Sequence, residues 1–193
     1  MTPPAILRIT WGIALLALVA VSPLDAMAAD EAKTTKLTIQ GIELNVPTSW
    51  ASQPPANNMR LAQFVVPGAT PEASAELVIS SFGGTVDANL NRWVAQFAAE
   101  GREVKVTQGK SPQGEYYVSD VFGTFNQPIG PPIAGRTKAV PGTRAISVML
   151  IVPEKGTFFL KLTGPDATVK AAAEDLRKSF GGNAANEVVY TPK

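Results

Sequence analysis

Short runs of β-branched and aromatic residues, several of them alternating with polar residues, recur along the chain and predict β-strands. Glycine, proline and asparagine bound most of these runs, as is usual for turns. The predicted strands are 36–40, 42–46, 59–66, 76–82, 103–107, 115–125, 143–152 and 157–163. Residues 186–190 form either a short last strand or a tail.

Two segments have a helical period instead. Val86, Leu90, Trp93 and Phe97 fall on one helical face, which predicts a helix over 86–99. Thr85 precedes this helix and its hydroxyl can accept a hydrogen bond from a first-turn amide. Gly101 follows it and is well placed to end it.

The second predicted helix begins at Pro165, a residue that suits the first helical position because its missing amide proton costs nothing there. Val169, Ala173, Leu176 and Phe180 form its apolar face, and two glycines follow it. Strands joined by short loops pair antiparallel, and each helix must bury one apolar stripe. We therefore predict an α+β fold: an antiparallel β-sheet of about six to eight strands covered by two helices.

The start of the chain has the pattern of a cleavable signal peptide over residues 1–28. Residues 11–21 are apolar throughout, and Ala26-Met27-Ala28 has the small-x-small form that a signal peptidase accepts. We expect cleavage after Ala28, or after Ala29. The alternative is an uncleaved membrane anchor, although a spanning helix needs about 20 apolar residues and this stretch is shorter.

The leader predicts a periplasmic or secreted protein with no stable membrane insertion after cleavage. The polar residues 29–35 are expected to form a flexible arm, and residues 36–193 a single α+β domain. This length is sufficient to bury a core without help from a metal or a disulfide.

The composition narrows the chemistry. The chain has no histidine and no cysteine, which excludes histidine-assisted nucleophiles and zinc, copper or haem sites that depend on these side chains. The net charge of +1 provides no basic field for nucleic acid. Carboxylate, lysine, tyrosine or arginine chemistry remains, and no cofactor is expected.

The segment 126–142 is the first candidate site. It is predicted to be a long loop between two strands, and long loops in compact domains are often functional. A partner or ligand could bind there to Arg136 and Lys138, and the alternative is a solvated connection. The candidate residues are Pro128, Pro131, Pro132, Arg136 and Lys138.

A second candidate is a structural ion pair. Tyr116, Val118, Asp120 and Phe122 share one face of a predicted strand, so Asp120 is a carboxylate in an apolar row. A buried carboxylate needs a charged or hydrogen-bonding partner. We expect Arg92, or another arginine, to pair with Asp120.

Four blocks of the sequence resemble known proteins. They are ELNVPTSW (43–50), MRLAQFVVP (59–67), GGTVDANLNRWVAQF (83–97) and FFLKLTGPDATVKAAAEDLRKSF (158–180). The chain is similar to a group of uncharacterised exported bacterial proteins, and its early VP…W and its strand, Gly-Pro turn and helix resemble the PsbP-like fold.

This resemblance spans most of residues 37–180 and implies an antiparallel sheet covered by helices. The photosynthetic members of that fold family are accessory binding proteins, which implies a non-enzymatic role. Some members hold metal through histidines, and this chain has none, so no metal site is implied.

Two functions follow as expectations. The first is a soluble, exported, non-enzymatic accessory module that binds an unknown protein or small-molecule partner through a sheet face or the segment 126–142. The second is a carboxylate-based hydrolase acting on envelope polymers, which would require two acids at a suitable spacing in one pocket.

Overall fold

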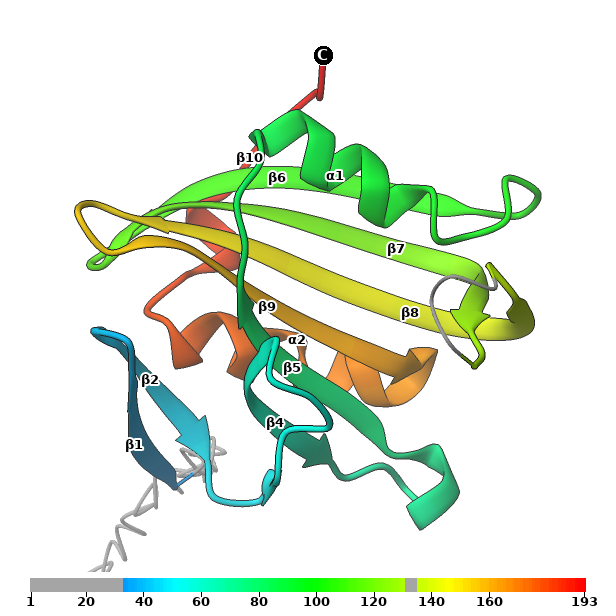
Figure 1. Ribbon diagram of the computed structural model, residues 1–193, viewed down its shortest axis with the longest axis horizontal. Helices are drawn as coiled ribbons and strands as arrows, with labels where there is room; N and C mark the ends of the chain where they lie inside the picture. The colour runs from blue at the N-terminus through cyan, green and yellow to red at the C-terminus, as the bar shows by residue number, and fades with distance from the viewer. Residues whose placement is uncertain (1–32, 131–134) are drawn as a thin grey trace, which may run out of the picture. The chain divides into compact units, whose positions relative to one another are not determined.

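An antiparallel sheet of eight strands is the scaffold of the residues that the computed structural model describes, 33–130 and 135–193 (Figure 1). In sheet order the strands are β10 (Val188–Val189), β6 (Glu103–Ser111), β7 (Gly114–Pro128), β8 (Thr137–Val152), β9 (Gly156–Pro165), β5 (Ala75–Ser81), β4 (Arg60–Val66) and β3 (Ala51–Gln53). The helices are α1 (Val86–Val94), α2 (Asp166–Ser179) and the 3-10 helices η1 (Pro71–Ala73) and η3 (Ala184–Asn186). The α+β prediction is confirmed.

Several sequence-based predictions fall on residues that the structure does not describe. These are the signal peptide (1–28), residues 29–32 of the arm, and Pro131 and Pro132. None of the helices within 33–130 and 135–193 has the length and apolar character needed to cross a membrane.

Strands β1 (Thr34–Ile39) and β2 (Ile42–Pro47) form a separate hairpin. Its turn is Gln40-Gly41, and both residues have positive φ angles, of 45° and 87°. Such a turn matches the twist of the two strands, which explains a glycine at this place. The predicted arm is wrong at its end: Thr34 pairs with Pro47, so β1 begins before residue 36 because the β2 backbone offers it hydrogen-bonding partners.

Helix α2 and the hairpin pack on one face of the sheet. The apolar stripe of α2 is buried as predicted, with Val169, Leu176 and Phe180 at its centre. Pro165, however, is the last residue of β9 and the N-cap of α2, not the first helical residue, because its backbone still pairs with Thr143 of β8. The same core includes Ile42, Leu44, Leu77, Ile79, Tyr116, Val118, Ile146, Val148, Leu150, Phe158, Leu160 and Leu162.

Helix α1 packs on the opposite face. Alternation along β8 shows this directly, because Val148 belongs to the core under α2 while Met149 packs against α1. Leu90 and Trp93 of α1 are buried there. As predicted, Thr85 caps the helix: its hydroxyl accepts a first-turn backbone N–H at 3.3 Å.

Helix α1 ends at Val94, well before the predicted end at 99. The reason is that the following residues find other partners. Phe97 forms a β-bridge with Phe125, and Arg102 donates to the carbonyl oxygens of Val94 at 3.1 Å and Phe97 at 3.2 Å. Gly101 therefore does not end the helix, and lies instead in the turn before β6.

The prediction of a loop over 126–142 is wrong at both ends. Strand β7 continues to Pro128 and β8 begins at Thr137, so the two strands form a long ribbon. Prolines are compatible with it because Pro128 ends a strand, and Pro141 lies in a bulge opposite Thr124 where the pairing shifts register.

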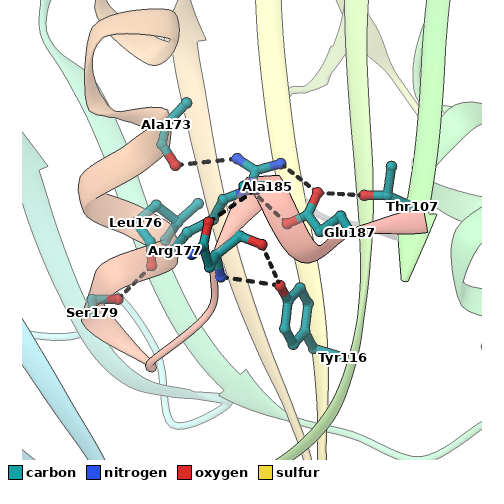
Figure 2. Close-up of polar contacts among 9 residues, drawn as sticks. Thr107, Tyr116, Ala173, Leu176, Arg177, Ser179, Ala185 and Glu187 are labelled. Carbon is teal, nitrogen blue, oxygen red and sulfur yellow. Dashed lines mark hydrogen bonds and ion pairs between the residues drawn. The ribbon is translucent and has the colours of Figure 1, made fainter. Parts of the chain in front are cut away.

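A buried ion pair attaches the C-terminal segment to α2 and the sheet (Figure 2). Arg177 donates to Glu187 twice, from Nε to Oε1 at 2.7 Å and from Nη2 to Oε2 at 3.1 Å, and the Thr107 hydroxyl donates to Oε2 at 2.7 Å. The Glu187 side chain is only 3% exposed. Burial alone would raise the pKa of Glu187, but the hydrogen bonds from Arg177 and Thr107 outweigh it and the pKa is lowered.

Candidate functional site

A cavity of about 820 Å³ lies on the α1 face of the sheet, beside the helix; we call it the sheet-face cavity. Helix α1 covers the part of this face near β7 and leaves strands β5 and β9 accessible next to it. Side chains from these two strands form the base of the cavity, and the ribbon of β7 and β8 contributes to its wall. The base residues are Glu76, Val78 and Ser80 of β5, and Phe159, Lys161 and Thr163 of β9.

Lys161 lies at the centre of this base. Its neighbours in register are Ser147 on β8 and Val78 on β5, so no carboxylate stands directly opposite it on either strand. Its Nζ donates a hydrogen bond to Gln96 Oε1 and lies 5.0 Å from the centre of the Phe125 ring. Both partners are uncharged, so the ammonium group has one hydrogen-bond acceptor and one aromatic ring beside it but no counter-ion in direct contact.

The surroundings of Lys161 disfavour its charged form. Burial, followed by the positive charge of Arg92, lowers the pKa of Lys161 from 10.5 to about 8, and the carboxylate of Glu76 opposes this shift. At neutral pH the amine is still protonated. The chain thus holds a positive charge in a place where burial and a neighbouring cation both work against it.

Arg92 is the second cation of the cavity. It comes from α1, and its Nη2 donates to Asn89 Oδ1 at 2.7 Å. Within the described ranges neither Arg92 nor Lys161 forms an ion pair, although eight other pairs are formed there. Two cations without direct counter-ions in one cavity produce a positive local field.

Aromatic rings form an apolar wall next to these cations. Phe159 stacks on Phe82 with ring centres 6.0 Å apart and meets Trp93 edge-on at 5.3 Å. Phe159 and Trp93 are buried, whereas Phe82 is 41% exposed. The cavity therefore joins a flat apolar surface to a positively charged one.

The acids of the cavity are Glu72 and Glu76. Glu76 Oε1 accepts hydrogen bonds from Arg60 at 2.9 Å and from Gln63 at 2.7 Å, so structural partners occupy it. Hydrogen bonds from its own backbone N–H and from Thr70 lower the pKa of Glu72. A glycosidase-type general acid requires a raised pKa, which this setting does not favour for Glu72.

The structure does not bring the described candidate residues of the segment 126–142 together in one site. Pro128 lines the sheet-face cavity. Arg136 and Lys138 are exposed on the ribbon and do not line it; Lys138 pairs with Gln127, and the carbonyl of Arg136 accepts the N–H of Ile129 at 2.9 Å.

The predicted pairing of Asp120 with an arginine is confirmed, but the arginine is Arg144, so the choice of Arg92 is wrong. Asp120 binds Arg144, with Nη1 and Oδ1 2.5 Å apart, and Arg144 Nε also donates to Asp166 at 2.6 Å. The physical reason is that Asp120 and Arg92 lie on opposite faces of the sheet. Asp120 shares its strand face with Tyr116, which is buried under α2, whereas Arg92 is on α1 across the sheet.

Sequence reasoning did not identify Lys161. A lysine that follows Phe159 on the same strand face is an ordinary amphipathic pattern, and most such lysines are solvated. Only the position of α1 and of the β7–β8 ribbon encloses it. Among the described residues no three acidic side chains are placed to hold a metal ion.

Comparison with known proteins gives similarity to solved structures. No family model matches the chain, and no curated protein sequence matches it. The chain is similar to the solution structure of cyanobacterial PsbP (CyanoP) from Synechocystis sp. PCC 6803, with 13% sequence identity, a TM-score of 0.47, and coverage of 88% of this chain and 100% of that one. At 13% identity and a TM-score of 0.47, this similarity says nothing about the function of this chain.

Proposed function

We propose that this chain is an exported, non-enzymatic binding module that takes a small-molecule ligand in the sheet-face cavity. The observation that carries the proposal is the cavity itself: about 820 Å³, next to a buried aromatic cluster and with Lys161 at its base. Ligand sites typically combine a concave apolar surface with a few fixed polar groups. The proposed export rests on the leader pattern of residues 1–28.

The construction of the cavity supports binding. Its base is a sheet, whose strands are held by backbone hydrogen bonds on both sides, so side chains on β5 and β9 are fixed in position. At its edge, Asn126 N–H donates to the Gln96 carbonyl at 2.8 Å, which ties the segment after α1 to the ribbon. A preformed site loses little entropy when it binds a ligand.

The proposal is tested by filling the cavity with a large side chain, which should prevent ligand binding. Val78→Trp places a large ring on the cavity base, and Val189→Trp on exposed β10 is the matched control. We expect compounds from a mixed library of neutral, anionic and cationic aromatic molecules to shift amide resonances of β5 and β9 by nuclear magnetic resonance. The shifts should be lost in Val78→Trp and kept in Val189→Trp.

Thr163→Trp fills the same base from β9 and serves if Val78→Trp does not fold. A library without any compound that shifts β5 and β9 would overturn the proposal. Compounds that still shift the β5 and β9 amide resonances in both Val78→Trp and Thr163→Trp would also overturn it.

A further inference from the structure

We propose that the ligand of the sheet-face cavity is an organic anion, with an oxyanion head held by Lys161 and Arg92 and a flat apolar body against the exposed ring of Phe82, which stacks on Phe159. This inference rests on the proposed function and names the chemical class of its ligand. Carboxylate, sulfonate and phosphate heads share the chemistry that the two cations recognise.

The first step concerns charge. Lys161 and Arg92 both line the cavity, and each donates to an uncharged side-chain amide. An oxyanion between them would supply the counter-ion that the described residues do not provide. It would also remove the repulsion between the two cations, which a neutral ligand would leave in place.

The second step concerns the charged groups around Lys161. Arg92 faces it from α1, Glu76 from β5 and Arg60 from β4, with Glu72 at the same cavity. Glu76 is held by Arg60, with Nη1 and Oε1 2.9 Å apart, so one positive and one negative charge are matched there. With Lys161 included, the cavity is lined by three positive and two negative side chains, a net charge of +1, and neither Lys161 nor Arg92 has a carboxylate in hydrogen-bond contact.

The third step concerns shape. The stacked rings of Phe82 and Phe159 lie on the same cavity as the two cations, and Phe82 is accessible from outside. A planar aromatic or unsaturated body can extend this stack at ring distances that aromatic pairs prefer. The ligand therefore has one charged end and one flat apolar end.

The test uses two dyes that differ by one group. The anionic probe 1-anilinonaphthalene-8-sulfonate carries a sulfonate, and N-phenyl-1-naphthylamine is the same ring system without it. At pH 7 we expect the anionic dye to bind the full chain more tightly than the neutral dye. Lys161→Met should weaken the anionic dye by about tenfold or more and change the neutral dye by about twofold or less.

Three controls define the site. Lys161→Arg keeps the charge and should retain binding, Lys105→Met removes an exposed lysine outside the cavity and should have no effect, and Val78→Trp should block both dyes. In the wild type, affinity for the anionic dye should fall as pH rises through about 8, because Lys161 then loses its proton.

The outcomes separate the two proposals. If both dyes bind equally, are blocked by Val78→Trp and ignore Lys161→Met, the cavity binds ligands but the anion inference is overturned. If neither dye responds to Val78→Trp, no binding occurs in the cavity with these probes, and the anion inference fails together with support for the cavity. A carboxylate and a phosphate analogue of the same ring system then distinguish the head groups, and failure of every anionic head to outcompete the neutral dye overturns the inference.

Discussion

Replacing Glu187 with alanine should lower the free energy of unfolding by about 3–5 kcal/mol, the usual cost of removing one partner of a buried ion pair. Glu187 accepts two hydrogen bonds from Arg177 and one from Thr107 (Figure 2). Without the carboxylate, the largely buried guanidinium of Arg177 has no counter-ion, and the link between α2 and the C-terminal segment is lost. Urea denaturation followed by circular dichroism measures the loss.

Glu174→Ala is the matched control. Glu174 pairs with Lys178 on the exposed surface of α2, so its removal should lower the free energy of unfolding far less than Glu187→Ala does. The stability difference between wild type and Glu187→Ala should have its full size above pH 4.5 and should shrink as the pH falls below it. The reason is that the pKa of Glu187 is lowered in the folded protein, so on acidification the unfolded chain takes up a proton at this carboxylate before the folded protein does. A loss below about 1 kcal/mol would contradict the structural role of the pair.

Replacing Lys161 with methionine should instead stabilise the protein, by about 1–2 kcal/mol at pH 7, because a charge that is costly to bury is replaced by an apolar chain of similar length. The pKa of Lys161 is lowered to about 8 in the folded protein. Between about pH 8 and 10.5 the unfolded chain therefore binds more protons at this site than the folded protein, and wild-type stability rises with pH relative to the variant.

The extra stability of Lys161→Met over the wild type should therefore diminish as the pH rises from about 8 to 10.5. Thermal unfolding at several pH values measures this change. Lys105→Met is the control, because Lys105 is exposed and should change stability little at any pH. A destabilised Lys161→Met protein would mean that the lysine is part of the structural framework. Stabilisation on its removal is instead the signature of a side chain retained for function.

The sequence was sufficient for features that depend on local pattern. The hairpin of β1 and β2 could be predicted because a single Gly41 separates two alternating runs, and α2 because Val169, Leu176 and Phe180 repeat at helical spacing. In these elements the pattern that specifies the structure is local, even though the apolar stripe of α2 packs on the distant strands β2, β8 and β9. Propensity, turn chemistry and burial agree there.

Features that depend on distant partners could not be predicted. The end of α1 is set by Arg102 and by the bridge between Phe97 and Phe125, and residues 126–128 and 137–140 form a ribbon because β7 and β8 pair beyond a bulge. Both override a local pattern that suggested something else. Proline and glycine in that segment indicated a loop, although Pro128 stands where the ladder ends and Pro141 and Gly142 stand where it shifts register.

In the candidate site, too, features that depend on local pattern could be predicted and features that depend on distant partners could not. Asp120 could be recognised as a carboxylate in an apolar row, but its partner Arg144 could not be chosen over Arg92 without knowing which face each helix covers. Lys161 is the stronger example, because its alternating strand resembles any strand with one solvated face. The enclosure by α1 and the ribbon is a tertiary property that no local pattern encodes.

The most direct measurement is a titration of the Lys161 side chain by nuclear magnetic resonance, using lysine labelled at the ε-carbon and Lys161→Met to assign the signal. We expect a pKa near 8 in the free protein, and a clear rise when 1-anilinonaphthalene-8-sulfonate is bound, because an anion stabilises the protonated amine. A signal that titrates near 10.5 and does not respond to the dye would contradict the account of this cavity.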